Sequence, residues 1–166
     1  MNNHFEKIIR LTALASVPAF LLTIATPNSA VASNFSACAS SLLDSGIAEE
    51  DAGVACADAL EPKMLSACVE KIQSETTLTG QDALAACYRV RRPEELASCV
   101  VKIDNNLASA ELANLALDNC RRSLLPERFA DCVVGLNNEI SAFSETEAID
   151  TCISAEDFPT ELFPRN

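Results

Sequence analysis

An apolar pattern occurs three times along the chain at intervals of 31 and 33 residues, each time after a proline. Counted from the proline, the apolar positions are 3, 6, 7 and 10, which lie on one face of an α-helix. Position 6 is a cysteine each time. The copies are Leu65, Cys68, Val69 and Ile72 after Pro62; Leu96, Cys99, Val100 and Ile103 after Pro93; and Phe129, Cys132, Val133 and Leu136 after Pro126. We call the helices that this pattern predicts the B helices.

A fourth copy comes earlier in the chain, with Ala32 in place of the proline, and consists of Phe35, Cys38, Ala39 and Leu42. Between the B helices lie Ala-rich segments that place a small residue four positions before a second cysteine. We call the helices predicted there the A helices. Their small residues and cysteines are Ala52 and Cys56, Ala83 and Cys87, Ala116 and Cys120, and Ala148 and Cys152. The chain therefore alternates B and A helices.

The pattern predicts an all-α fold, an array of αα-hairpin repeats. Its eight helices are expected at 34–45, 48–60, 62–75, 79–91, 93–106, 110–122, 126–140 and 144–154. Proline pushes the preceding residue out of the helical region and suits the first position of a new helix. Each A helix is thus expected to run to its proline, with a corner of one or two residues before the next B helix.

Two A helices have capping-box starts, since Thr79 precedes Asp82 and Ser144 precedes Glu147 at the required spacing. The B helices lack such starts. Glu61, Arg92 and Leu125 stand at their N-cap positions, where a shorter polar side chain is preferred.

The eight cysteines predict four disulfides, because each lies within a helical apolar stripe and none forms the Cys-x-x-Cys pair typical of redox sites. Two pairings fit the repeat. In one, each B cysteine joins the next A cysteine: Cys38–Cys56, Cys68–Cys87, Cys99–Cys120 and Cys132–Cys152. In the other, the bonds cross the proline corners and leave Cys38 and Cys152 unpaired. The first pairing is favoured because it uses every cysteine.

Residues 1–32 have the features of a signal peptide: a basic start, an apolar run broken by Pro18, and small residues up to Ala32. The run is too short for a transmembrane helix. We expect one Cys-rich domain over 33–166, exported to the periplasm or the extracellular space. That part holds 10 basic and 23 acidic residues, a balance that repels nucleic acid.

Six of those ten basic residues lie near the second and third prolines and predict a basic rim if the hairpins stack in register. We call them the rim arginines: Arg89, Arg91, Arg92, Arg121, Arg122 and Arg128. One interpretation pairs them with Glu94, Glu95 and Glu127. The other makes the rim, with Tyr88, a docking site for an anionic group of another protein or of the cell envelope. The C-terminal segment, with Phe158, Leu162 and Phe163, is expected to cap the last hairpin or to contact another protein.

Catalysis is not indicated. The only histidine, His4, belongs to the predicted signal peptide, and the chain has no nucleophile motif or glycine-rich phosphate loop. We therefore expect a non-enzymatic binding or structural module without metal or cofactor, in an oligomeric state that the sequence leaves open. The alternative is a thiol-based, copper-type metal-binding or redox-buffering protein of the cell envelope.

Overall fold

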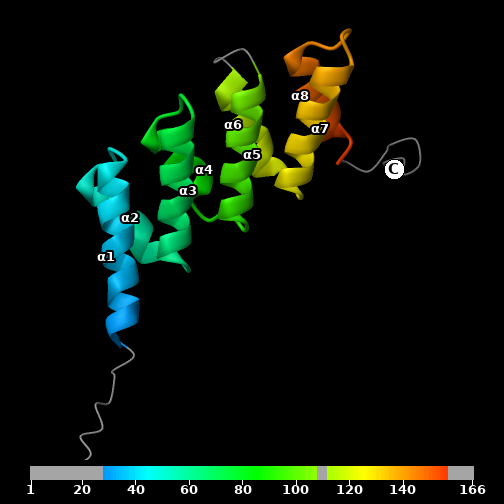
Figure 1. Cartoon of the computed structure of the whole chain (residues 1–166). Coiled ribbons are helices and arrows are strands. Elements are labelled where there is room, and N and C mark those ends of the chain that lie inside the picture. Colours follow the sequence, from blue (N-terminus) through cyan, green and yellow to red (C-terminus); the bar gives the residue numbers. More distant parts are fainter. Residues whose placement is uncertain (1–27, 108–111, 157–166) are drawn as a thin grey trace, which may run out of the picture.

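The computed structural model describes residues 28–107 and 112–156, in which four helical hairpins stand in a row (Figure 1). The B helices form one layer: α1 (Asn28–Asp44), α3 (Pro62–Glu75), α5 (Pro93–Asn106) and α7 (Pro126–Glu139). The A helices form the second: α2 (Glu49–Asp58), α4 (Gly80–Cys87), α6 (Ala113–Arg122) and α8 (Glu145–Ser154). The described residues contain these eight helices and no strand, which confirms the predicted all-α hairpin array.

The core lies between the two layers and between successive B helices. Val69, Val100 and Val133, at position 7 of the repeat, have no exposed surface. Each A helix presents its small residue to the core, and the four alanines Ala52, Ala83, Ala116 and Ala148 are buried. A methyl group at that place lets an A helix approach its B helix closely, since interiors are packed to near-crystalline density.

One polar contact joins each pair of successive B helices at the surface. The Ser41 hydroxyl donates to the Glu70 carboxylate, the Lys71 ammonium donates to the Ser98 hydroxyl, and the Lys102 ammonium pairs with the Asp131 carboxylate. The first member of each pair is position 9 of its repeat. Contacts of this kind add little stability. Position 9 meets position 5 of the next repeat at Ser98 and Asp131, and position 8 at Glu70.

The predicted corner of one or two residues between an A helix and the next B helix was wrong, because these connections are longer. They comprise residues 59–61, 88–92 and 123–125, because α2, α4 and α6 end before their prolines. The helix predicted over 79–91 ends at Cys87, and Arg89 takes a left-handed φ of 57°. At Glu61, Arg92 and Leu125 the φ angle is −129° to −135° and the ψ angle 72° to 84°, the non-helical backbone expected before proline.

The predicted capping boxes are confirmed at Thr79 and Ser144, whose side chains accept hydrogen bonds from the backbone N–H groups of Asp82 and Glu147. No side chain caps α3, α5 or α7, each of which starts with proline instead. Proline has no N–H group and leaves one fewer donor to satisfy at the helix start.

Helix α1 begins at Asn28 rather than at the predicted residue 34. Ala32 takes the proline position in this repeat, so nothing ends the helical conformation there. The helix thus continues across the predicted signal-peptide cleavage site. The signal peptide itself stays a prediction, because residues 1–27 lie outside the described part of the chain.

All eight cysteines form disulfides, in the favoured pairing: Cys38–Cys56, Cys68–Cys87, Cys99–Cys120 and Cys132–Cys152. The Cα atoms of each pair are 5.9 to 6.0 Å apart, as disulfides require. Every bond joins a B helix to the A helix that follows it, so each hairpin carries one disulfide.

Candidate functional site

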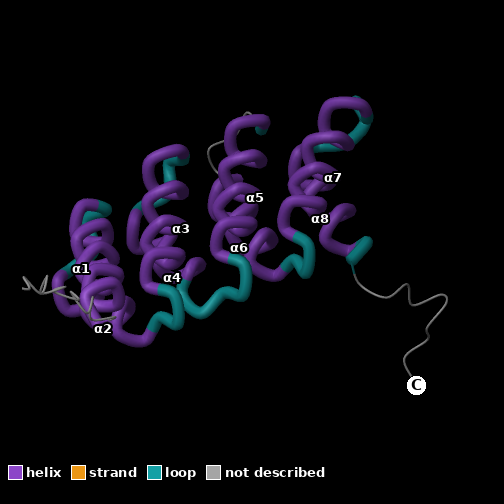
Figure 2. Tube along the Cα trace, turned by 60° about the horizontal axis from the view of Figure 1, so that its bottom comes forward, coloured by secondary structure: helices purple, strands orange, loops and turns teal. Residues whose placement is uncertain are grey.

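The three A-to-B connections lie along one edge of the array (Figure 2), which we call the corner edge. A groove of about 700 Å³ opens there between the first two connections. One side consists of residues 58–61 with the first turn of α3, and the other consists of residues 87–91 with Pro93. The groove therefore lies where two hairpins meet.

The groove is mainly apolar. Leu65 and Cys87 are buried beneath it, and Met64 and Val90 are half-buried along it. Leu60 stands beside the groove with its side chain completely exposed, at 101% of the reference area. A leucine in this state has no packing partner in the protein itself, and exposed apolar surface next to a groove is typical of interaction sites.

A polar contact holds the two sides of the groove together. The Tyr88 hydroxyl donates to Asp58 Oδ2 at 2.6 Å, and Arg89 Nη2 donates to the same oxygen at 3.2 Å. The Arg89 guanidinium also lies 5.1 Å from the centre of the Tyr88 ring. The hydrogen bond from Tyr88 is the main cause that lowers the pKa of Asp58, with the Arg89 charge adding to it, and the same hydrogen bond raises the pKa of Tyr88. Asp58 is thus held as a carboxylate, and the groove is formed before any partner binds.

The rim arginines are all exposed, and all lie at or beside the corner edge. One predicted ion pair is present, between Arg92 Nη1 and Glu95 Oε2 at 3.0 Å. Arg89 pairs with Asp58, an acid that the sequence analysis did not consider. Arg91 borders the groove and has no acidic partner among the described residues. Its charge is therefore available to a ligand, and its docking role remains a prediction.

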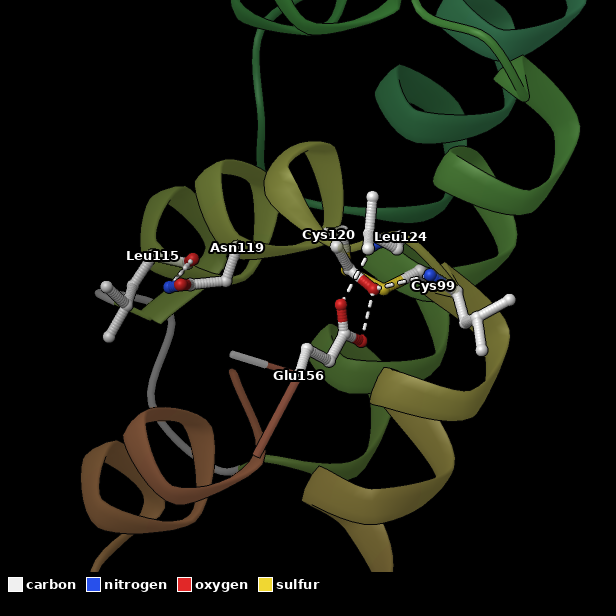
Figure 3. Close-up of a disulfide and its surroundings, with 8 residues drawn as sticks. Cys99, Leu115, Asn119, Cys120, Leu124 and Glu156 are labelled. Carbon is white, nitrogen blue, oxygen red and sulfur yellow. Dashed lines mark hydrogen bonds between the residues drawn. A yellow bond between two sulfur atoms is a disulfide. The ribbon is translucent and has the colours of Figure 1, made fainter. Parts of the chain in front are cut away.

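The third connection also has an exposed leucine, but different hydrogen bonds hold this connection in place. Leu124, two residues before its proline like Leu60, is 76% exposed. Glu156, just after α8, accepts hydrogen bonds from the Ser123 hydroxyl at 2.6 Å and from the Leu124 backbone N–H at 2.8 Å (Figure 3). Sequence reasoning missed both leucines. Their signal was an apolar residue outside the helical frame, two positions before a proline.

The cysteines offer no second site. With every sulfur in a disulfide, no thiolate remains to bind a soft metal or to react. The described residues also hold no cluster of histidine, cysteine and carboxylate side chains suited to a metal ion. Phe158, Leu162 and Phe163 of the predicted C-terminal cap lie outside the described residues.

No protein-family model, curated protein or solved structure matches this chain. Within residues 28–107 and 112–156, no helix is long and apolar enough to cross a membrane. The groove at the corner edge is therefore the observation from which a function has to be argued.

Proposed function

We propose that the protein is an exported, non-enzymatic binding module that holds an acidic, partly apolar segment of another protein in the groove at the corner edge. The carrying observation is Leu60, a fully exposed leucine beside a groove whose two sides are already joined by Tyr88 and Asp58. Burying such a side chain on binding stabilises a complex, and a preformed groove loses little conformational entropy.

The chemistry of the groove favours one kind of segment. An apolar side chain of the partner packs against Leu60 and Met64, and a carboxylate next to it pairs with Arg91. The chain has a net charge of −12, so an exposed arginine without an acidic partner selects the few acidic groups that fit beside it. Glu61 also borders the groove and disfavours a segment that is negative along its whole length.

Export is the second part of the proposal. Four disulfides fit an oxidising environment such as the periplasm or the extracellular space, and the N-terminal sequence has the pattern of a signal peptide. In that setting the disulfides keep the hairpins intact. The thiol-based alternative is disfavoured because it needs free sulfur atoms, whereas all eight are bonded.

The test uses two double variants that change the same chemistry at two connections. Leu60→Ser with Arg91→Ser removes the leucine and the arginine at the groove. Leu124→Ser with Arg122→Ser is the matched control, because it removes the same residue types from the third connection and from the end of α6 next to it. Proteins retained by the immobilised wild type from an envelope fraction are identified, and acidic peptides from them are titrated against each variant.

We expect peptide binding to fall about tenfold or more in the groove variant, as for loss of an interface anchor, and to stay unchanged in the control. Amide NMR shifts of the wild type should cluster at residues 58–65 and 87–93. Equal losses in both variants, or shifts centred on another surface, would refute the groove as the binding site. Circular dichroism melting checks that both variants remain folded.

A further inference from the structure

The first B helix has an apolar face without a neighbour. In α1, Phe35 and Leu43 are 38% and 43% exposed. Phe35 is position 3 of the repeat, and its equivalents Leu65, Leu96 and Phe129 are all buried, at 0% to 5% exposure. Each of those later helices follows another hairpin. In α1 no hairpin precedes it among the described residues (Figure 1).

The opposite end of the row has the complementary face. Cys132 and Leu136 of α7, at positions 6 and 10, are only half-buried. Their equivalents in α3 and α5, where another hairpin follows, are completely or almost completely buried: Cys68, Ile72, Cys99 and Ile103. The two ends of the array therefore expose the two opposite sides of the junction that occurs three times inside it.

That junction contains no disulfide. All four disulfides lie within hairpins and none crosses from one hairpin to the next. Successive hairpins are held together by side-chain packing, by one polar contact between B helices, and by a connection of three to five residues. The same packing can form between two molecules, although the short connection is missing and Gly135, at position 9 of α7, has no side chain for the polar contact.

Charge favours this contact. Residues 28–43, almost the whole of α1, contain no charged side chain, and neither do residues 132–138 of α7. In a chain of net charge −12, two copies repel each other over most of their surfaces. The two end faces are places where copies approach without like charges meeting.

We infer that copies of this chain stack head to tail, with α1 of one copy packed on α7 of the next as a B helix packs on its predecessor inside the array. Such an interface uses different surfaces on the two partners, so it does not end at a dimer and produces an open chain of copies or a ring. The C-terminal segment is the other occupant to consider for the α7 face. Removal of residues 157–166 tests that alternative in the experiment below.

The experiment measures the mass of the oxidised, full-length exported protein by sedimentation from micromolar to millimolar concentration. Phe35→Glu places a charge on the α1 face. Gly135→Trp adds bulk on the α7 side, at a position where a Cβ atom meets nothing within 4 Å, and circular dichroism checks that the single copy remains folded. Leu136→Glu is a second variant of that face, with helix content checked by circular dichroism.

For the wild type we expect the mean mass to rise with concentration past that of a dimer. Phe35→Glu and Gly135→Trp should each weaken association about tenfold or more, as for a charge or a clash in an apolar contact. Mixed in equal amounts, the two variants should form dimers and nothing larger, because each retains one intact face. Leu60→Glu changes the groove and not the ends, so it should assemble like the wild type even if the proposed binding function fails.

Three results would overturn the inference. One is a wild type that stays monomeric at millimolar concentration. Another is dimerisation of Phe35→Glu alone, which would indicate a symmetric contact through α7. The third is assembly seen only when residues 157–166 are removed, since that segment would then cover α7 in the full chain.

Discussion

Replacing Cys99 and Cys120 with alanine removes the disulfide between α5 and α6, in the third of the four hairpins (Figure 3). The matched change is Cys132 and Cys152 to alanine, which removes the disulfide of the last hairpin. The two bonds span 21 and 20 residues. Loop-closure entropy in the unfolded chain is then nearly equal and contributes about 3 kcal/mol in each case.

The two variants differ in how deeply the replaced cysteines are buried. Cys99 and Cys120 have no exposed surface, whereas Cys132 is half-buried. Removing two fully buried sulfur atoms leaves a larger void, worth about 1 kcal/mol more than at the partly open site. We therefore expect the free energy of unfolding to fall by about 4 kcal/mol for the third hairpin and about 3 kcal/mol for the fourth.

The assay is urea unfolding of the oxidised proteins, followed by the helical circular dichroism signal. The third hairpin has neighbours on both sides, so its loss also weakens two junctions and should broaden the transition more than loss of the terminal hairpin. Losses below about 1 kcal/mol in both variants would contradict the entropic estimate. A larger loss in the fourth hairpin than in the third would contradict the argument from burial.

Two further changes test local features. Gly80→Ala should destabilise the protein by about 1–3 kcal/mol in thermal or urea unfolding, because a Cβ atom there overlaps the Ser45 carbonyl oxygen. The control Gly53→Ala, on an open helix surface, should be neutral or stabilising. Equal effects of the two variants would refute the overlap. Tyr88→Phe should raise the pKa of Asp58 in an NMR titration, since the tyrosine hydroxyl is the main cause that lowers it. A folded-state pKa below the unfolded value adds stability above about pH 4, and this stability is lost as pH falls through the folded pKa. The stability difference between wild type and Tyr88→Phe should therefore shrink on acidification. An unchanged pKa of Asp58 in the variant would exclude the assigned cause.

Much of the fold followed from local rules. The apolar positions 3, 6, 7 and 10 after proline specify one helical face, and that face is buried in α3 and α5 as the pattern predicted. The starts of α4 and α8 followed from Thr79 and Ser144, because capping depends on residues only three positions apart. The disulfide pairing also followed, since only one of the two pairings that fit the repeat uses all the cysteines.

The end of α6 at Arg122 was predicted, but the ends of α2 and α4 did not follow from such rules. Proline restricts only the residue before it, which sets where a helix must have stopped and not how much earlier it stops. In the structure, α4 ends at Cys87 and the chain passes through a left-handed Arg89. There the side chains of Tyr88 and Arg89 reach Asp58, 30 and 31 residues away in sequence. That contact exists only when two hairpins are stacked.

The sequence by itself thus determined the repeat, the helices and the covalent pairing of this protein, because each depends on residues within one hairpin or on a count. Only the tertiary structure decided which apolar side chains remain exposed. Phe35 occupies a core position of the repeat, and it is exposed because no hairpin precedes α1 among the described residues. Exposure depends on the presence of a neighbouring hairpin, a long-range property that no local pattern encodes.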